Sequence, residues 1–177
     1  MRVLGVDSDT RYVGASLWDG QKISAVGILK RYPGWISSPP PIKWMKPDLI
    51  LIEFPEITKA HTMRGVKPQN LVTLAGAAGE VGGILQTVFP KAELRYVLPK
   101  TWKGSVPKPI AQERYAREIG LEGERMPSYY KVKDWGELTT FVYPSGKISS
   151  SIMQHGLDAA GIALWASKLR RLPKSAI

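Results

Sequence analysis

The amino-terminal stretch reads RVLGVDSDTRYVGASLWDGQKISAVGIL (residues 2–29) and decides the fold class, because it contains three apolar runs in close succession. Residues 2–7 alternate between two faces and predict a buried strand. Residues 12–18 and 23–29 predict two more strands, and the Asp19-Gly20 pair between them is typical of a short hairpin turn. The chain therefore opens with an antiparallel meander of three strands.

The next part of the chain predicts parallel strands and helices. Residues 48–53 (DLILIE) contain four consecutive aliphatic residues, the pattern of a strand covered on both faces. Helix, strand, helix and helix follow at residues 69–88 (after Pro68), at 93–98, from Pro107 or Pro109 to about Ile119, and at 152–171. We therefore expect an α/β fold with a five-stranded mixed sheet, three antiparallel and then two parallel strands, flanked by helices.

Two segments do not follow this pattern. Residues 31–47 include Pro39-Pro40-Pro41 and predict an irregular connection with at most a short helix before Pro47. Residues 121–150 predict a loop insertion, and a loop of that length inside a compact domain is usually functional or mobile. We expect residues 1–177 to form a single domain with this loop insertion.

The composition limits the partners and the chemistry. There are 25 Lys and Arg against 15 Asp and Glu, which gives a net charge of +10 and favours polyanions such as nucleic acid, although a basic balance also serves solubility alone. The absence of cysteine excludes disulfides, thiolate zinc sites and cysteine nucleophiles. With two histidines in the chain, a metal must be held mainly by oxygen, which suits Mg²⁺, with Mn²⁺ as a substitute.

No targeting or membrane-spanning segment is predicted from the sequence. The first apolar run stops at Asp7, and the longest aliphatic stretch, residues 49–52, is too short to span a bilayer. We expect a soluble protein of a reducing compartment, with no membrane partner.

Three acidic residues stand at the ends of predicted elements. Asp7 closes the first strand, Glu53 closes the fourth, and Asp158 falls on the first turns of the last helix. If the two strands are neighbours, the carboxylates converge and repel one another unless cations lie between them. Two Mg²⁺ ions about 4 Å apart would resolve this and would support phosphodiester hydrolysis. Taken singly, each acid also has a purely structural interpretation, as a turn residue, a solvated strand end or a first-turn helix acid.

Two further groups of residues have both a functional and a structural interpretation. Lys100, Lys103 and Lys108 cluster in sequence beside Trp102, which is either a basic patch with an aromatic stacking surface for nucleic acid or a solvated loop. Gly76, Gly79 and Gly83 recur on one side of the predicted 69–88 helix. Each glycine lowers the stability of the helix by about 1 kcal/mol relative to alanine. Close approach of a second helix would offset this, either at a two-fold dimer interface or by packing inside the domain.

The sequence resembles RuvC-type Holliday junction resolvases of the RNase H-like superfamily. The segments RVLGVDSDTRYVGASLW, DLILIEFPE and HGLDAAGIALWA are similar to the three acidic motifs of that family, LAGAAGEVGGIL to its small-residue helix, and YVLPKTWKGSVPKPIAQ to its lysine-bearing strand and loop. The resemblance covers most of residues 1–119 and 151–166. It implies an RNase H-like sheet, a homodimer, and Mg²⁺-dependent resolution of Holliday junctions or other branched DNA by paired nicks that leave 5′-phosphate ends. It also implies a cytoplasmic location, in a bacterial or phage-infected cell.

The resemblance assigns roles to individual positions. Asp7, Glu53 and Asp158 become metal-binding carboxylates, and Lys103 and Lys108 become contacts to the scissile phosphate. His155 lies three residues before Asp158, so both project from one helical face. It could ligate metal, orient the attacking water or simply cap the helix.

Two positions depart from the family pattern. Asp9 stands where the family usually has Gly. Glu56 stands where an aromatic wedge is expected, which leaves Phe54, His61 or Met63 as substitutes for that wedge.

Two other functions share these features. One is an RNase H-like nuclease of different substrate preference, and the other is a non-catalytic DNA-binding protein on the same fold. The second predicts tight, salt-sensitive DNA binding without metal-dependent nicking.

Overall fold

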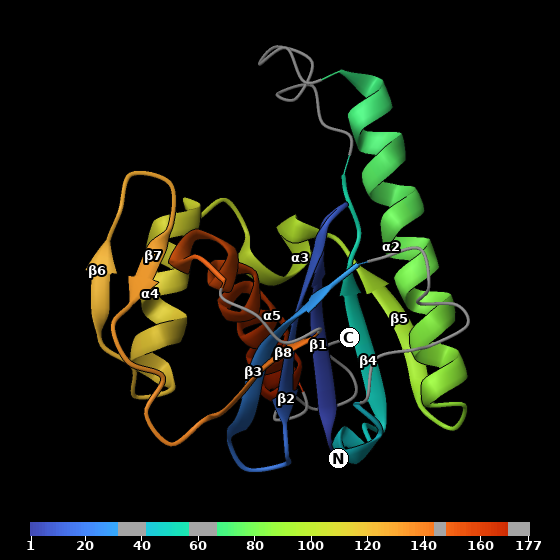
Figure 1. Ribbon diagram of the computed structural model, residues 1–177, viewed down its shortest axis with the longest axis horizontal. Helices are drawn as coiled ribbons and strands as arrows, with labels where there is room; N and C mark the ends of the chain where they lie inside the picture. Colours follow the sequence, from blue (N-terminus) through green and yellow to red (C-terminus); the bar gives the residue numbers. More distant parts are fainter. Residues whose placement is uncertain (32–41, 57–66, 144–147, 170–177) are drawn as a thin grey trace.

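The computed structural model describes residues 1–31, 42–56, 67–143 and 148–169 (Figure 1). The predicted meander is present as strands β1 (Val3–Ser8), β2 (Tyr12–Trp18) and β3 (Ile23–Lys30), paired antiparallel. In the β2–β3 turn, the Asp19 carboxylate accepts hydrogen bonds from the backbone N–H groups of Gln21 and Lys22. Gly20 takes a φ of +113°, so the turn uses the freedom that made Asp-Gly a hairpin signal.

Two parallel strands extend the sheet beside β1. Strand β4 (Leu49–Glu53) pairs parallel with β1 on one side and with β5 (Glu93–Val97) on the other. Ile50 and Ile52 are completely buried, as expected of a strand covered on both faces. Because β1 and β4 are parallel neighbours, their carboxyl ends lie at the same edge of the sheet.

The sheet has six strands, so the expected count of five is one short. Its order is β5-β4-β1-β2-β3-β8, and the additional strand β8 (Thr139–Tyr143) pairs parallel with β3. A separate antiparallel pair, β6 (Gly123–Arg125) and β7 (Tyr130–Val132), also lies within the segment predicted as a loop. Strands β6 and β7 are too short to show a period. Strand β8 consists of β-branched and aromatic residues and its stretch is hairpin-like in sequence, but its exposed threonines lie on an edge strand and break the apolar alternation.

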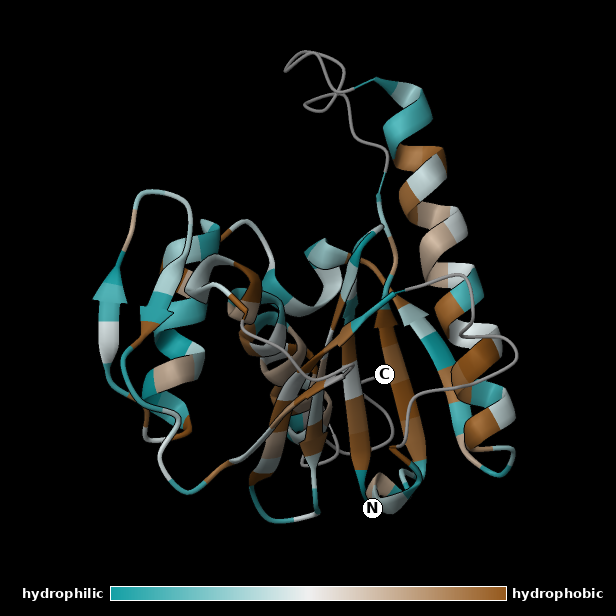
Figure 2. Cartoon of the chain, in the orientation of Figure 1, coloured by the Kyte–Doolittle hydropathy of each residue, from teal (hydrophilic) through white to brown (hydrophobic). Residues whose placement is uncertain are grey.

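Helices cover both faces of the sheet (Figures 1 and 2). Helix α2 (Pro68–Val88) packs its buried residues with one face of the sheet in an aliphatic core that includes Val6 and Ile52. Helix α5 (Ser150–Leu169) covers the opposite face, and α4 (Lys108–Glu118) packs beside it. Two short helices complete the structure, the 3-10 turn η2 (Lys43–Met45) before Pro47 and α3 (Pro99–Lys103) after β5. The mixed α/β architecture is therefore as predicted, with α3 as an addition.

Helix α5 approaches the sheet backbone closely because two strand residues lack a side chain. A Cβ at Gly14 would collide with the carbonyl of His155, and a Cβ at Gly5 would collide with the carbonyl of Ala159. Gly14 is also the cross-strand partner of Asp7. The contact that seats α5 on β2 therefore lies directly beside the carboxyl end of β1.

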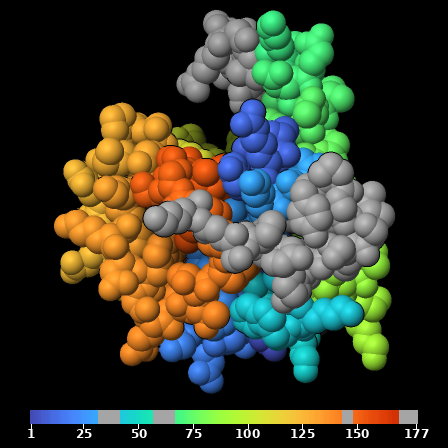
Figure 3. All heavy atoms as spheres, viewed as in Figure 1, coloured from blue at the N-terminus to red at the C-terminus, as the bar shows by residue number. Residues whose placement is uncertain are grey.

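The amino-terminal part of α2 projects beyond the ends of the strands (Figures 1 and 3). Gly76, Gly79 and Gly83 face away from the domain, since a Cβ at any of them would meet nothing within 4 Å. The interpretation in which these glycines pack inside the domain is therefore wrong, and Gly82 is the glycine that fits against Tyr96 and Ile52. In length and mean hydropathy (1.3) α2 would suffice to cross a membrane, but its buried side packs here as a core helix does.

Candidate functional site

The carboxylates converge at the edge of the sheet where β1 and β4 end. Asp7 lies near the end of β1 and Glu53 at the end of β4. Asp158 reaches the same place from α5, two turns after that helix begins. Asp7 and Asp158 are 8% and 4% exposed, which is unusual for acidic residues that lack a compensating charge. The local compensation comes from one histidine and two lysines.

His155 makes the shortest contact within this group. Its Nδ1 lies 2.7 Å from Oδ2 of Asp7, joining the first strand to the last helix. Potential ligand atoms of Asp7, His155 and Asp158 all lie within 4.8 Å of one another. Glu53 lies outside this compact group, although its charge acts on the same residues. The expected site thus consists of a tight Asp-His-Asp cluster with Glu53 beside it.

Trp102 holds Glu53 and does not form a stacking surface. Its indole Nε1–H donates a hydrogen bond to Glu53 Oε2 at 2.8 Å, and the side chain is only 6% exposed. Its ring packs against Tyr115, with the two centroids 5.7 Å apart. In this structure the buried ring offers no face on which a base could stack, and the residue lies at the site as a hydrogen-bond donor to Glu53. The sequence identified the residue but not the direction of its side chain.

The three lysines lie around the carboxylates at different depths. Lys108 Nζ lies 2.8 Å from Asp158 Oδ2. Lys103 Nζ lies 4.0 Å from Glu53 Oε2 and 5.2 Å from the centroid of the Trp102 ring. Lys100 is exposed and lines a pocket of about 600 Å³ that begins at Glu53. Each lysine is thus placed to meet an anion that approaches the carboxylates.

Gln112 also belongs to this site and has no counterpart among the predicted residues. Its Nε2 donates to Asp158 Oδ1 at 2.9 Å, and its Oε1 accepts from the backbone N–H of Tyr130 at 2.8 Å. The only signal in the sequence is a polar residue beside Ala111 on the buried side of α4. Tyr130 itself is buried and packs in the core.

The pKa shifts follow from burial and from mutual repulsion. Burial raises the pKa of Glu53 to about 7, and the negative charge of Asp7 adds to this effect. Burial likewise raises the pKa of Asp158, although the charge of Lys108 opposes the shift. For Asp7, burial acts in the same upward direction, but the hydrogen bond and charge of His155 hold its pKa below the ordinary value.

Burial acts in the opposite direction on the pKa values of His155 and Lys108. Burial alone would lower the pKa of His155, but the hydrogen bond and charge of Asp7 raise it above the ordinary value. Burial also disfavours the charged form of Lys108, and the charges of Asp158 and Asp7 raise its pKa nonetheless. A group of acids that needs neighbouring cations in this way provides the electrostatic conditions for binding a metal ion.

The donor set fits a divalent metal ion that prefers oxygen. Asp7 and Asp158 offer carboxylate oxygens and His155 offers one imidazole nitrogen, all close enough together to share one ion. Such a set suits Mg²⁺ or Mn²⁺. Glu53, held by Trp102 on the adjacent strand, could complete this site or share a second ion with Asp7.

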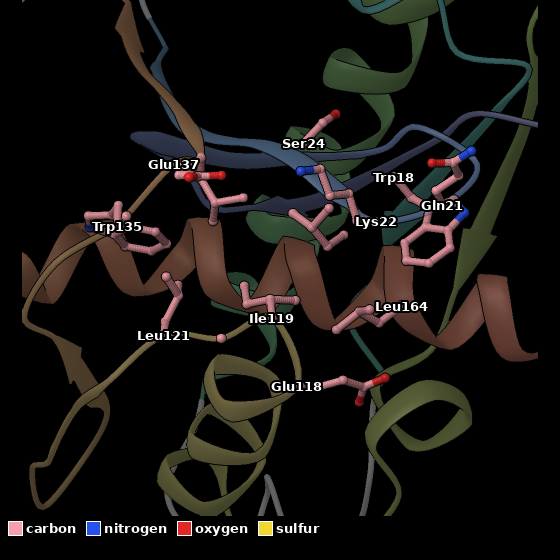
Figure 4. Close-up of a pocket in the computed structure, with 14 residues that line it drawn as sticks. Trp18, Gln21, Lys22, Ser24, Glu118, Ile119, Leu121, Trp135, Glu137 and Leu164 are labelled. Atoms are coloured by element: carbon pink, nitrogen blue, oxygen red, sulfur yellow. The ribbon is translucent and has the colours of Figure 1, made fainter.

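A second pocket lies at the opposite end of the sheet (Figure 4). It has a volume of about 550 Å³ and is lined by Trp18, Trp135, Leu164 and the polar residues Lys22, Glu118 and Glu137 among others. Trp18 pairs with Val3 at the start of β1, whereas Asp7 lies near its end. This pocket is therefore separate from the carboxylates and takes no part in the chemistry considered below.

The departures from the family pattern have local explanations. Asp9 follows β1, and its carboxylate accepts a hydrogen bond from the backbone N–H of Thr10, so it serves the turn before β2. Phe54 is partly buried and packs edge-on against Tyr96, with ring centroids 5.4 Å apart. His61 and Met63, the other two candidates for the wedge, lie outside the described residues.

No protein-family model and no curated protein sequence matches this chain. Solved structures do. RuvC of Thermus thermophilus in complex with a Holliday junction substrate superposes with a TM-score of 0.55 at 14% identity, over 97% of this chain and 96% of that one. A second structure of RuvC from Thermus thermophilus gives a TM-score of 0.52 at 15% identity, over 97% of this chain and 96% of that one. The yeast mitochondrial Holliday junction resolvase Ydc2 gives a TM-score of 0.41 at 12% identity, over 96% of this chain and 80% of that one. The resemblance to RuvC is thus confirmed at the level of the fold.

Proposed function

We propose that this protein is a metal-dependent endonuclease that resolves Holliday junctions or other branched DNA. The observation that carries the proposal is the buried group of Asp7, His155 and Asp158, with Glu53 beside it and lysines on its rim. Its position on a RuvC-like fold supports the choice of substrate, since one similar structure is described as a complex with a Holliday junction. The net charge of +10 supports a polyanionic substrate.

The carboxylates and His155 would hold the metal. Asp7, Asp158 and His155 would bind one Mg²⁺, and Glu53 with Asp7 would share a second. Bound there, the ions would supply a water of lowered pKa and would neutralise charge on the scissile phosphate. His155 is fixed by Asp7 through Nδ1, which leaves its Nε2 to ligate an ion or to orient the attacking water.

The lysines would hold the DNA backbone. Lys103 and Lys108 lie at the carboxylates and would contact the scissile phosphate, whereas Lys100 is exposed and would contact a flanking phosphate. Lys108 bonds Asp158 in this structure, so it must move or share that oxygen when metal and phosphate arrive. The contribution of these lysines should decline with salt, as expected of phosphate contacts.

A homodimer would supply two such sites for paired nicks. Gly76, Gly79 and Gly83 form a glycine stripe on the outward side of α2, with Val72 also strongly exposed on that helix. An exposed helix that keeps three glycines gives up stability unless something packs against them. A second copy related by a two-fold axis would bring α2 against α2 and present two cutting sites to the symmetric arms of a junction.

Cleavage of a synthetic four-way junction tests the proposal directly. With Mg²⁺ and each strand labelled in turn, wild type should nick two opposing strands symmetrically, and DNA ligase should reseal the products because they carry 5′-phosphate ends. Asp7→Asn and Asp158→Asn should abolish cleavage, while the matched control Asp48→Asn, an exposed acid that accepts from Arg2 N–H, should cleave normally.

Each alternative gives its own result in the same assay. Cleavage of RNA–DNA hybrids or flaps but not of junctions indicates a nuclease of different preference. Tight junction binding with no nicking in Mg²⁺ or Mn²⁺ indicates a non-catalytic DNA-binding protein. Equal cleavage by wild type and Asp7→Asn overturns the proposed site.

A further inference from the structure

Gln112 is a fully buried amide whose hydrogen-bonding groups all have partners. Its residue exposure is 0%, and it lies on α4, which packs against both α5 and the β6–β7 pair. Nε2 donates to Asp158 Oδ1 at 2.9 Å and lies 3.4 Å from Gln154 Oε1. Oε1 accepts from the backbone N–H of Tyr130 at 2.8 Å. A buried amide with this number of bonds is held in one rotamer and one orientation.

The bond from Tyr130 decides which way the amide faces. A backbone N–H can only donate, so the Gln112 atom that meets Tyr130 must be the carbonyl oxygen. The amino group is then forced toward Asp158, where it can only donate. Rotating the amide would set two donors against each other and leave a buried acceptor without a proton, which is strongly unfavourable. The β7 backbone therefore fixes the end of Gln112 that Asp158 meets.

The two oxygens of Asp158 consequently have different partners. Oδ1 takes a neutral hydrogen bond from Gln112, and Oδ2 lies 2.8 Å from the ammonium group of Lys108. A carboxylate with one oxygen held in this way can turn little about its side-chain bonds. Oδ2 is thus the oxygen available to a cation, which is Lys108 in this structure.

We infer that Gln112 is a positioning residue, which anchors Asp158 to the β6–β7 hairpin so that Oδ2 is presented to the metal ion. The inference rests on the metal site of the proposed function but concerns residues that have no predicted role. It also gives the segment at 121–150 a function, because Tyr130 belongs to that segment. Hydrogen-bond partners of metal ligands typically change metal affinity 10- to 100-fold when removed.

Mn²⁺ binding to the folded protein tests this without relying on cleavage. Free Mn²⁺ is measured by electron paramagnetic resonance in titrations of wild type, Gln112→Met and Gln112→Asn. Methionine keeps the volume but makes neither bond, and asparagine keeps an amide too short to reach both partners. We expect both variants to raise the dissociation constant for Mn²⁺ by about tenfold or more.

Gln86→Met is the matched control. Gln86 also makes two side-chain bonds, to the carbonyls of Phe89 and Ala92, but at the far end of α2. Its loss should lower the free energy of unfolding, by less than the loss of Gln112 because Gln86 is only half-buried, and the variant should bind Mn²⁺ as wild type does. Gln112→Asn keeps a polar group in the buried position, so it serves as the test if Gln112→Met does not fold.

Cleavage supplies a second measurement that a general loss of stability would not produce. The Mg²⁺ concentration for half-maximal junction cleavage should rise about tenfold in Gln112→Asn, with the rate at saturating Mg²⁺ within a few-fold of wild type. Folded Gln112 variants with unchanged Mn²⁺ affinity, or a Gln86→Met variant that loses as much, overturn the inference. If wild type cleaves no junction, the proposed function fails and the Mn²⁺ titration still decides the role of Gln112.

Discussion

Asp7 Oδ2 lies 2.7 Å from His155 Nδ1, although 148 residues separate the two in the chain. Since burial is the largest influence on His155 and acts to lower its pKa, the raised value depends on Asp7. We expect Asp7→Asn to bring the pKa of His155 below its ordinary value of about 6.5. An NMR titration of the imidazole protons measures this, with the chain's other histidine, His61, as an internal reference. An unchanged pKa of His155 in Asp7→Asn would show that the pair is not coupled.

Glu53 should destabilise the metal-free protein at high pH. Its pKa is about 7 in the folded state against about 4.5 when unfolded, so the folded state binds the extra proton and this residue's contribution to stability declines as pH rises from 4.5 to 7. Glu53→Gln removes the penalty and should raise the free energy of unfolding by about 2–3 kcal/mol at pH 8, with no difference below pH 4.5. Urea unfolding in EDTA at several pH values measures this. Adding Mg²⁺ should favour wild type, and a variant less stable than wild type at pH 8 in EDTA would contradict the prediction.

Trp102 should matter through its indole N–H. Trp102→Phe keeps most of the packing against Tyr115 but removes the hydrogen bond to Glu53. We expect a loss of about 1–2 kcal/mol in the free energy of unfolding and a roughly tenfold rise in the Mg²⁺ needed for cleavage. Trp44→Phe is the control, since Trp44 is 45% exposed and packs edge-on against Phe141 away from the carboxylates. If the two substitutions change the free energy of unfolding and the Mg²⁺ requirement equally, Trp102 has no special role at the site.

The contact between Gly14 and α5 should tolerate no side chain. Gly14→Ala must push the His155–Gly156 backbone away from β2, and we expect it to lower the free energy of unfolding by about 3 kcal/mol or more and to weaken metal binding. Gly76→Ala is the same chemical change where a Cβ meets nothing within the protomer, so at concentrations at which the protein is monomeric it should raise the free energy of unfolding by up to about 1 kcal/mol. Chemical unfolding followed by circular dichroism compares the two. Similar effects at both positions would contradict the close seating of α5.

The glycine stripe should lie at the dimer interface. Gly79→Arg places a large charged side chain in the stripe and should convert a dimer to a monomer without loss of helix, because arginine is the better helix former. Sedimentation velocity measures the change, with Gln21→Arg in the exposed β2–β3 turn as the control. A wild-type protein that is monomeric at all concentrations tested, or a Gly79→Arg variant that remains dimeric, would contradict this arrangement.

The sequence revealed the elements whose residues repeat with a clear period. The meander, β4 and α2 were predicted within a residue or two, because their apolar residues reflect burial on one face or on both. Strand β8 was missed because an edge strand with exposed threonines has no such pattern. Its place beside β3 depends on pairing between residues more than a hundred positions apart, which a local pattern does not contain.

The residues of the site also fall into those that the sequence could predict and those that it could not. Acids at strand ends could be predicted to converge, because parallel neighbours end at one edge of a sheet. The direction of Trp102 and the role of Gln112 could not be predicted, because each depends on which strand or helix lies beside it in three dimensions. Both residues turn inward to hold a carboxylate, and a sequence pattern does not distinguish that from an outward-facing aromatic or an ordinary buried amide.

The bare backbone under α5 has a consequence for how this fold can change over time. The distance of α5 from the sheet is set at Gly5 and Gly14 by backbone atoms, which every residue possesses, and not by the shapes of interlocking side chains. The larger aliphatic residues around the helix can then be replaced, with compensating changes in neighbouring residues, while the distance between helix and sheet stays the same. A protein built this way can share its architecture with another protein and yet have few residues identical to it.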